Sequence, residues 1–491
     1  MVERLYNSET DEEVKSALSP MYVDFDNSIL RSPLRVEAAF VLCRKNLLRF
    51  LKLIPSYFFD NSDFNEKLFE LAPINIETLP YNQELMTFLR KEYESGRKLI
   101  IVSSYPLSFI RRIGEYLGIF YGVLASTSYD RITSKVMDLR LSQEYPDGNY
   151  AYVGSHKRDL RLFQKSRESY AVDPSYFFRR LISENSNIKT VTTGKKSVYH
   201  QILKASRPHQ WVKNFLIYLP LLLSGENPDA SNFILCTLGF VSFCFVSSSV
   251  YVLNDLLDLN ADRLHQDNKK RPFASGNLPV TYAFILIPVY LFLGIFFSIQ
   301  VGHDFSIAIF WYYILTCLYS FVLKEVSFAD ILLLASLYTC RIFSGALAAH
   351  VPLSNWFLTF SGFFFTSLAL LKRTSELIII KKSSRIKLQR RGYYIDDLNQ
   401  IVSFGTTSGY ISVLVFALYL SEEKFGSQYH NPRLLWLIGP FLIYWISRLW
   451  LKAQRGRMTS DPIVFALKDK KSYVVFLCIF IVWFLAKVGY Y

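Results

Sequence analysis

One short segment of the chain carries three carboxylates and an amide at spacings that could bind a metal ion. It runs from Asn254 to Asp262, contains Asp255 and Asp258, and follows an apolar run long enough to cross a membrane. On a continuous helix of about 100° per residue, these four side chains share one narrow face. Carboxylates at the carboxyl end of a helix oppose its dipole and repel one another, so we expect Mg²⁺ to bind these oxygens. A merely solvated charged face is the less favoured interpretation.

Polar and cationic residues at the ends of other apolar runs are candidates for binding phosphates. Arginine can hold a phosphate through two parallel hydrogen bonds, and lysine acts as a point charge. For any single lysine or arginine, placement on the inner side of a membrane is an equally good explanation. For Asp330 and Arg341, inside or beside an apolar run, a buried structural pair is the alternative. The candidate substrate-binding residues are Lys213, Asn214, Arg271, Tyr319, Lys324, Asp330, Arg341, Lys372 and Arg373.

The distribution of apolar residues divides the 491-residue chain into two parts. Residues 1–200 carry charges throughout, as soluble domains do, whereas apolar runs of about 20 residues follow one another from about residue 209. No cleavable signal peptide is expected at the start. We expect nine membrane-spanning helices, at roughly 210–223, 233–253, 282–301, 304–322, 328–348, 355–371, 402–421, 433–450 and 473–490.

The lysines and arginines between these runs predict the orientation of the chain. With the N-terminal part in the cytoplasm, the inward loops hold cationic clusters at 263–271, 372–391 and 448–471, whereas the outward loops at 302–303 and 349–354 hold none. This asymmetry follows the positive-inside rule and predicts a multi-pass protein of the cytoplasmic membrane. The net charge of +14 is explained by these loops, so nucleic acid is not an expected partner. The six cysteines form no CxxC pair, and neither disulfides nor a zinc site is expected.

Further motifs lie at the cytoplasmic ends of the same runs. RPHQWVKN precedes the first run, RPFASG follows the aspartates, YSFVLK ends the fourth run, KRTSE follows the sixth, and DPIVFAL precedes the ninth. Together with the NDxxDxxxD pattern of 254–262, residues 207–491 resemble the UbiA superfamily of intramembrane prenyltransferases. Within it, they look most like the polyprenyl (decaprenyl)-phosphate phosphoribosyltransferases. The second DxxxD motif of the aromatic prenyltransferases is missing, because the comparable region has only Asp330.

The resemblance implies a Mg²⁺-dependent transfer of 5-phosphoribosyl from phosphoribosyl diphosphate to a polyprenyl phosphate. Asn254, Asp255, Asp258 and Asp262 would bind the metal ion, with Asp255 and Asp258 as the catalytic pair. Two other functions stay open. One is prenyl transfer from a prenyl diphosphate to an aromatic or other small acceptor, and the other is an inactive lipid-binding scaffold.

Three apolar stretches of the N-terminal part end in polar residues. The stretch at 21–26 ends in DxD, the one at 99–104 ends in two serines, and the one at 150–159 ends in GSHKRD. Helical patterns separate them, which predicts an α/β fold with a Rossmann-like parallel sheet whose strand ends bring these polar groups together.

In this order the three motifs resemble the haloacid dehalogenase superfamily of phosphotransferases. The resemblance covers residues 20–185, with a helical cap around 31–95 and a linker at 186–206 before the membrane part. It implies that Asp24 is the nucleophile and a metal ligand, and that Asp26 is the acid/base. It further implies phosphate binding by Ser103 and Lys135 and metal binding by Asp159.

Two departures from the haloacid dehalogenase pattern leave the activity of this part open. Asn27 stands where glycine is usual, and Ser155 replaces the more common aspartate of the last motif. An active phosphatase and an inactive scaffold are both compatible with these residues. For an active enzyme, we expect the substrate to be the 5-phosphate of the lipid made by the membrane part.

Overall fold

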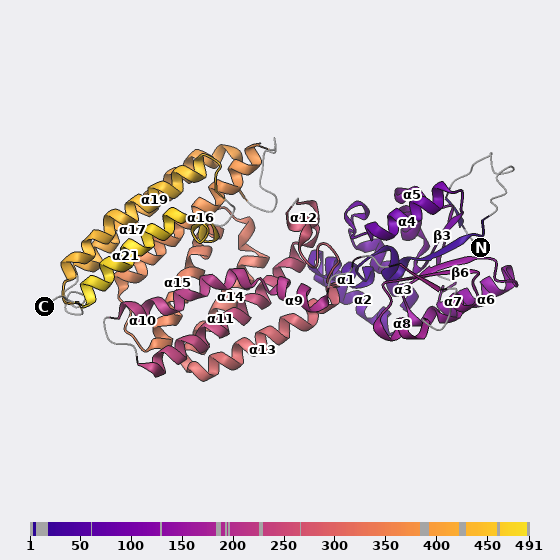
Figure 1. Cartoon of the computed structure of the whole chain (residues 1–491), viewed down its shortest axis with the longest axis horizontal. Coiled ribbons are helices and arrows are strands. Elements are labelled where there is room, and N and C mark those ends of the chain that lie inside the picture. Colours follow the sequence, from indigo (N-terminus) through magenta and orange to yellow (C-terminus); the bar gives the residue numbers. More distant parts are fainter. Residues whose placement is uncertain are drawn as a thin grey trace. The chain divides into compact units, whose positions relative to one another are not determined.

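The computed structural model describes two compact units of the chain (Figure 1). The first comprises Met1–Ala205 together with Asp255–Ile285, and the second comprises Ser206–Asn254 together with Leu286–Tyr491. The described residues are 3–5, 18–59, 61–127, 130–182, 188–191, 194, 197–224, 229–265, 267–382, 392–421, 429–458 and 462–488.

A seven-stranded sheet forms the centre of the first unit (Figure 1). Its strand order is β1-β4-β3-β2-β5-β6-β7, with β1 antiparallel to β4 and the other neighbours parallel. The predicted α/β class with a parallel sheet is therefore confirmed. The strands are β1 (Glu3–Arg4), β2 (Met21–Asp24), β3 (Leu99–Pro106), β4 (Gly122–Ser126), β5 (Ala151–Gly154), β6 (Glu168–Val172) and β7 (Ile188–Val191).

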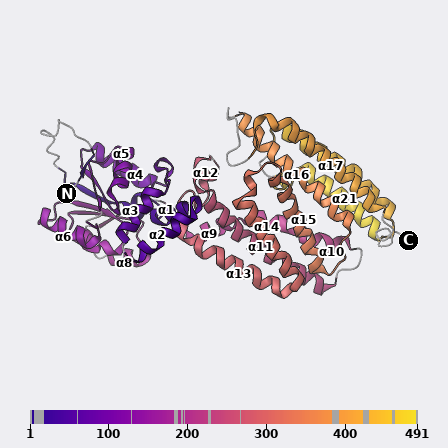
Figure 2. The same ribbon diagram turned by 180° about the vertical axis from the view of Figure 1, so that it is seen from behind.

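Both faces of this sheet are covered by helices. Along β2, Met21 and Val23 pack into one apolar core while Tyr22 packs into the other, because successive strand residues point to opposite faces. Helices α4 and α5 lie on the first face and α6, α7 and α8 on the second (Figures 1 and 2). Their bounds are α4 (Gln83–Glu94), α5 (Leu107–Leu117), α6 (Ser134–Glu144), α7 (Leu160–Lys165) and α8 (Tyr176–Ile182).

The chain between β2 and β3, where a helical cap is predicted, is mainly helical. It begins with a π-helical turn, η1 (Phe25–Ile29), and continues through α1 (Leu34–Lys45), α2 (Leu47–Phe59), α3 (Asn61–Leu71), η2 (Ile76–Thr78) and α4.

The range predicted as a linker, 186–206, contains regular structure among its described residues. Ile188 and Val191 pack against the apolar cores of the sheet, so β7 extends the sheet beside β6. Helix α9 (Val198–Ser206) follows. Because most residues of this range are polar, the sequence did not indicate a strand at its two apolar positions, which hold β7 in place.

Seven helices in the described part of the chain are long and apolar enough to cross a membrane. A multi-pass membrane protein is therefore confirmed. The seven segments are Ala230–Leu257, Val280–Val301, His303–Phe321, Ala329–Ala349, Ile395–Leu420, Pro432–Gln454 and Lys470–Val488, which contain α11, α13, α14, α15, α17, α19 and α21 in that order.

The remaining two of the nine predicted spans differ from these seven. The run at 210–223 forms η4 (Pro208–Tyr218), a 3₁₀ helix, followed by the short helix α10 (Leu219–Leu223). Pro220 has no backbone N–H, so one continuous α-helix there would lack a hydrogen bond. The run at 355–371 lies within the longer helix α16 (Asn355–Lys382), which ends in charged residues.

Helix α16 packs between α15 (Ala329–Ala349) and α17 (Leu398–Leu420), and α17 packs on α19 (Ile438–Gln454). Helix α21 (Lys470–Val488) also packs on α19 (Figure 1).

Candidate active sites

The aspartate motif, defined as Asn254–Asp262, spans the junction of two helices. Helix α11 (Ala230–Leu257) ends before Asp258, and α12 (Leu259–Leu264) begins after it. Asp258 has φ −98° and ψ 7°, so the expectation of one continuous helix is not met. The break moves Asp258 from the unfavourable end of the α11 dipole to the favourable start of α12. Its carbonyl oxygen accepts a 2.8 Å hydrogen bond from the Asp262 amide.

Arg271 joins two carboxylates of this motif. Its Nη1 lies 2.6 Å from Asp262 Oδ2 and 3.4 Å from Asp255 Oδ1, and both aspartates are buried. Asn268, which sequence reasoning did not single out, donates a 2.9 Å hydrogen bond from Nδ2 to Asp262 Oδ1. Burial raises the pKa of Asp262 to about 6, with added repulsion from Asp255 and Asp258, although Arg271 acts in the opposite direction.

The oxygen atoms of the motif suit a divalent cation. Asp255 and Asp262 are buried and share the guanidinium of Arg271, and the half-buried Asp258 lies between them in the sequence. In the chain as described, no three His, Cys, Asp or Glu side chains are grouped tightly enough to hold a metal ion as they stand. The carboxylates would therefore have to rotate toward a bound ion, while their oxygen atoms are the kind of ligand that Mg²⁺ binds.

A second polar cluster, in the second unit, centres on Arg373 of α16. Its Nε donates a 2.7 Å hydrogen bond to Asp330 of α15, and both side chains are fully buried. Glu376 pairs with the same guanidinium, and the Tyr319 hydroxyl of α14 (His303–Phe321) lies 3.4 Å from its Nη2. Tyr393, which the sequence did not single out, donates a 2.5 Å hydrogen bond to Asp330. Asp330 thus has Arg373 as its partner, and the alternative pairing with Arg341 is not formed.

Arg341 belongs to a separate buried network. Its Nε donates to Asn214 Oδ1 at 2.9 Å, its Nη2 to the Tyr312 hydroxyl at 2.7 Å, and its Nη1 to the Leu337 carbonyl at 2.7 Å. These bonds connect η4 with α14 and α15. Nothing in the sequence distinguished Tyr312 from the other tyrosines, because only the packing of α14 on α15 brings it to Arg341.

The remaining cationic candidates lie in different surroundings. Lys324 is buried in η7 (Leu323–Glu325), Lys372 is half-buried in α16, and the Lys213 ammonium lies 5.8 Å from the centre of the Tyr338 ring. The last part of the cationic cluster, 383–391, and Asp461 of the DPIVFAL motif lie outside the described residues.

A third polar cluster forms where the strands of the first unit end. Asp24 ends β2, whose neighbours are β3 and β5, and Asp159 lies in η3 (Lys157–Asp159) after β5. Ser104 donates a 2.8 Å hydrogen bond to Asp26, whereas the buried Ser103 hydroxyl accepts one of 3.1 Å from the Tyr105 amide. The serine that contacts a carboxylate is therefore Ser104, the neighbour of the predicted Ser103.

The three carboxylates of this strand-end cluster, Asp24, Asp26 and Asp159, are harder to ionise than usual. Burial raises the pKa of Asp24 well above its ordinary value, and the charges of Asp26 and Asp159 raise it further. Burial raises the pKa of Asp26 to about 6, against the effects of Ser104 and Arg158, and it also raises the pKa of Asp159. Asp24 Oδ2, Asp26 Oδ1 and Asp159 Oδ2 are buried and accept no hydrogen bond from the described residues. These oxygens fit a bound cation, which would relieve their repulsion.

Lys135 occupies a different position from the one expected for a phosphate-binding lysine. It is exposed in the first turn of α6, while the preceding residue, Ser134, donates a hydrogen bond to Asp159. Sequence reasoning missed Ser134 and Arg158, although Arg158 lies within the quoted GSHKRD motif and offsets the negative charge of all three carboxylates.

Comparisons with known proteins agree with this two-part organisation. A protein of Sinorhizobium fredii called y4nM is 30% identical over 458 residues, which cover 93% of this chain and 89% of that protein. The decaprenyl-phosphate phosphoribosyltransferase of Mycolicibacterium smegmatis is 27% identical over 288 residues, covering 57% of this chain and 91% of the enzyme. Among solved structures, a UbiA homolog from Archaeoglobus fulgidus bound to DMAPP and Mg²⁺ matches with a TM-score of 0.44 and 16% identity, over 59% of this chain and 100% of that one. The UbiA prenyltransferase family matches residues 215–470, and the chain belongs to this family.

Proposed function

We propose that the membrane part transfers 5-phosphoribosyl from phosphoribosyl diphosphate to a polyprenyl phosphate, with Mg²⁺ as cofactor. The observation that carries the proposal is the aspartate motif, where the buried Asp255 and Asp262 share the guanidinium of Arg271 and Asp258 lies between them in the sequence. This arrangement suits a metal-bound diphosphate, and relatives of the chain are named decaprenyl-phosphate phosphoribosyltransferase.

In the proposed reaction, one bond at the ribose C1 is exchanged for another. The bond from C1 to the diphosphate oxygen breaks, diphosphate leaves with the bonding electrons, and a phosphate oxygen of the lipid bonds to C1. The acceptor phosphate is already anionic, so the step needs no strong general base. Asn254, Asp255, Asp258 and Asp262 would hold Mg²⁺, which neutralises the leaving diphosphate when bound. Arg271 would steady the buried carboxylates and add positive charge beside the diphosphate.

The remaining predicted residues divide into two proposed roles. We propose that Lys213, Lys324 and Lys372 attract the phosphates of the two substrates. The other five form hydrogen bonds with side chains in buried clusters, and we propose that they shape the site and keep its helices in place. They are Asn214, Tyr319, Asp330, Arg341 and Arg373.

Transfer of labelled phosphoribosyl into the lipid phase tests this function. Membranes containing the full chain receive labelled phosphoribosyl diphosphate and polyprenyl phosphate, and label is expected in the lipid only when Mg²⁺ is present. EDTA should abolish the transfer, and added Mg²⁺ should restore it. Asp255→Asn should reduce the rate by about 100-fold or more, because it removes a charged ligand. Asp267→Asn, the same change at an exposed position after α12, is the matched control and should leave the rate unchanged.

A parallel reaction distinguishes the second candidate function. Membership of a prenyltransferase family favours prenyl transfer as the alternative chemistry. If label moves from a prenyl diphosphate to an aromatic acid, and none moves from phosphoribosyl diphosphate, the phosphoribosyl proposal is wrong. If neither label moves in membranes whose protein is folded, the scaffold interpretation replaces both.

We propose that the soluble part, over 20–185, is a haloacid dehalogenase-type phosphohydrolase. Its strand-end cluster carries three buried carboxylate oxygens that accept no hydrogen bond from the described residues, and a bound cation would satisfy them. Asp24 would attack phosphorus and displace the alcohol, Asp26 would give that alcohol a proton, and water would then release phosphate from Asp24. The raised pKa of Asp26, about 6, suits a group that must hold and give up a proton near neutral pH. We propose Ser103, Ser104 and Lys135 as phosphate-binding residues, with Asp24 and Asp159 as metal ligands.

Phosphate release by the full chain tests the phosphohydrolase proposal. With Mg²⁺, the protein is expected to release phosphate from simple phosphate monoesters and from the 5-phosphate of a phosphoribosylated polyprenyl lipid. Asp24→Asn should abolish the release, and Asp147→Asn, an exposed change in the same part, should not affect it. Equal release by the wild type and Asp24→Asn would contradict the assignment.

A further inference from the structure

The segment that contains most of the aspartate motif packs with the N-terminal part of the chain. Residues 255–285 form one compact unit with residues 1–205, although the first three of them end a membrane-spanning helix. Two sets of polar contacts hold this segment. They join residues 263–277 to helix α1 and to the loop that precedes α1.

The first set is a buried ion pair between Glu37 and Arg263. Arg263 immediately follows Asp262 of the motif, and Glu37 lies in the first turn of α1. Both guanidinium Nη atoms of Arg263 bond to the Glu37 carboxylate, the second at 3.0 Å, and the two side chains are only 4% and 2% exposed. The Arg263 Nε also donates to the Ala274 carbonyl at 3.3 Å. Loss of one partner would leave the other as an uncompensated buried charge.

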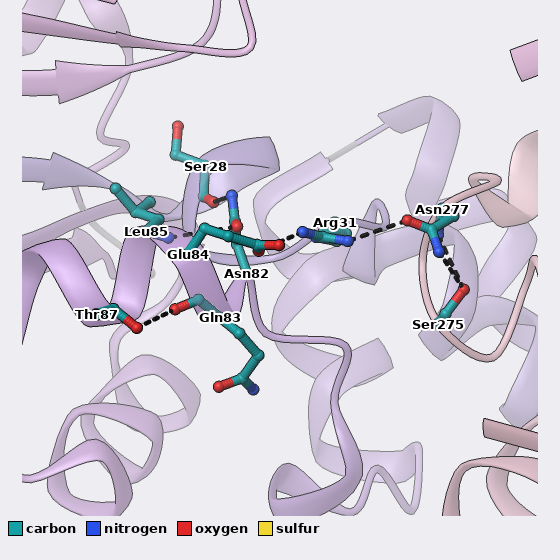
Figure 3. Close-up of polar contacts among 9 residues, drawn as sticks. All are labelled: Ser28, Arg31, Asn82, Gln83, Glu84, Leu85, Thr87, Ser275 and Asn277. Carbon is teal, nitrogen blue, oxygen red and sulfur yellow. Dashed lines mark hydrogen bonds and ion pairs between the residues drawn. The ribbon is translucent and has the colours of Figure 1, made fainter. Parts of the chain in front are cut away.

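The second set connects Arg31 with the loop at 275–277 (Figure 3). Arg31 Nη1 donates a 3.0 Å hydrogen bond to Asn277 Oδ1, and its Nη2 pairs with Glu84 at the start of α4. Asn277 in turn donates to Ser275 at 2.8 Å. Gly276 has φ +70°, and a Cβ there would lie 2.7 Å from the Arg31 Cβ. The two segments of the chain therefore approach so closely that only glycine fits at this position.

The anchoring residues are also joined to the strand-end carboxylates by a short and well-bonded stretch of chain. Six residues separate Asp24 from Arg31, and the turn between them is held by Asn82, as Figure 3 shows in part. The backbone amide of Asn82 donates a 2.8 Å hydrogen bond to the Ile29 carbonyl, and its side-chain Nδ2 donates one of 3.2 Å to the Ser28 carbonyl. Backbone and hydrogen bonds therefore connect the end of β2, the turn after it and the anchoring residue Arg31.

We propose that Glu37 and Arg31 are positioning residues through which the soluble part holds the aspartate motif in its active geometry. This inference rests on the proposed metal-binding function of that motif. Glu37 fixes Arg263 and, through the backbone, the adjacent Asp262, while Arg31 fixes the loop that returns from Arg271 to the next membrane helix. The soluble part is thus a structural support of the transferase site as well as a domain with its own carboxylate cluster.

Hydrogen exchange on the full chain in detergent tests the anchoring without any substrate. Glu37→Gln is expected to raise exchange at least tenfold over residues 259–265 and 271–282, and to leave β5 and β6 unchanged. The charge exchange Glu37→Arg with Arg263→Glu should restore part of the protection. Lys67→Gln, which breaks the exposed Lys67–Asp63 pair of α3, is the matched control and should change neither region.

Transfer kinetics give the second readout. Glu37→Gln should lower kcat about tenfold and raise the Mg²⁺ concentration for half-maximal rate, with the KM for polyprenyl phosphate nearly unchanged. Arg31→Gln, at a partly exposed and less demanding position, should shift both values in the same direction by a smaller factor. It keeps the test informative if the buried Glu37 variant does not fold.

Two outcomes would overturn the inference. One is unchanged exchange over 259–282 in folded Glu37→Gln and Arg31→Gln proteins. The other is increased exchange with unaltered kcat and Mg²⁺ dependence, which would make the contacts structural only. If the wild type itself transfers no phosphoribosyl, the proposed function fails, and the exchange data still report on whether Glu37 and Arg31 hold the segment.

Discussion

At the scale of single residues, the chain concentrates carboxylates at two buried places. Asp255 and Asp262 share one arginine, whereas Asp24, Asp26 and Asp159 have buried oxygens that accept no hydrogen bond from the described residues. Such groups cost folding free energy, and active sites commonly retain them because the same charges bind metal ions and substrates. The Asp330–Arg373 pair is different, because its hydrogen bonds satisfy both charges inside the protein.

The raised pKa of Asp26 predicts a stability that depends on pH. Because the pKa of Asp26 is higher in the folded state, its protonated form contributes its full stabilisation below about pH 4. This contribution is lost as the pH rises through about 6. At pH 7.5 without metal, Asp26→Asn should therefore stabilise the sheet by about 1–3 kcal/mol. At pH 4 the gain should be close to zero.

Hydrogen exchange of β2 in the full chain, measured with EDTA at both pH values, checks this prediction. Asp147→Asn provides the control, since an exposed carboxylate should give no pH-dependent gain. An equal gain for Asp26→Asn at pH 4 and pH 7.5 would show that the ionisation of Asp26 is not its cause.

Removal of Asp330 should destabilise the second unit. Asp330→Ala deprives the fully buried Arg373 of its 2.7 Å partner and Tyr393 of its acceptor, and we expect a loss of about 3–5 kcal/mol. Asp63→Ala, which breaks an exposed pair, should cost less than about 1 kcal/mol. Thermal unfolding of the full chain in detergent compares the two variants. A stable Asp330→Ala protein that has lost only its affinity for phosphoribosyl diphosphate would instead assign Asp330 to substrate binding.

At the scale of elements, small residues allow close approach between the segments of the second unit. A Cβ at Gly345 of α15 would lie 2.2 Å from the Ile217 carbonyl oxygen of η4, so these two segments touch through their backbones. The approach lets Arg341 of α15 reach Asn214 of η4 at 2.9 Å. Gly362 of α16, in contrast, has open space where a Cβ would stand.

Two glycine substitutions test this packing. Gly345→Ala should force η4 away from α15 and destabilise the protein by about 1–3 kcal/mol, with a weakened Asn214–Arg341 bond. Gly362→Ala should be neutral or stabilise α16 by up to about 1 kcal/mol, because alanine favours helix and meets no neighbour. Thermal unfolding in detergent measures both, and equal effects of the two substitutions would contradict the close contact.

At the scale of the whole molecule, the chain combines an α/β part with a helical membrane part. The similarity to y4nM extends over 93% of the chain, so the match includes residues of both parts. The α/β part contains the strand-end cluster, and the segment 255–285 that carries most of the aspartate motif packs with it.

The loop charges predict opposite sides of the membrane for two exposed positions. In a variant whose native cysteines are replaced, Lys45→Cys at the end of α1 should react with an impermeant thiol reagent only from the cytoplasmic side. His303→Cys, at the start of α14 and just after α13 (Ala283–Val301), should react only from the opposite side. Labelling in intact cells and in inverted membrane vesicles distinguishes the two sides. Reaction of both cysteines from one side would refute the predicted topology.

The fold class and the seven membrane helices could be predicted from the sequence because their signals are local. A stretch of about 20 apolar residues must span or be buried, and an apolar strand that ends in polar groups places them at a sheet edge. The same local signals carried the family resemblance, whose UbiA part the comparisons confirm.

The identity of the partners depended on the tertiary structure. The sequence by itself determined that Asp255, Asp262, Arg271, Asp330 and Arg373 would be functional or buried, since charges near a membrane are costly. Only the tertiary structure decided three pairings. Arg271 contacts both Asp255 and Asp262, and Asp330 forms its ion pair with Arg373 and not with Arg341. Glu37 forms its ion pair with Arg263, which lies 226 positions later in the sequence. Such pairings depend on how distant segments pack, and a charge pattern along the chain does not contain that information.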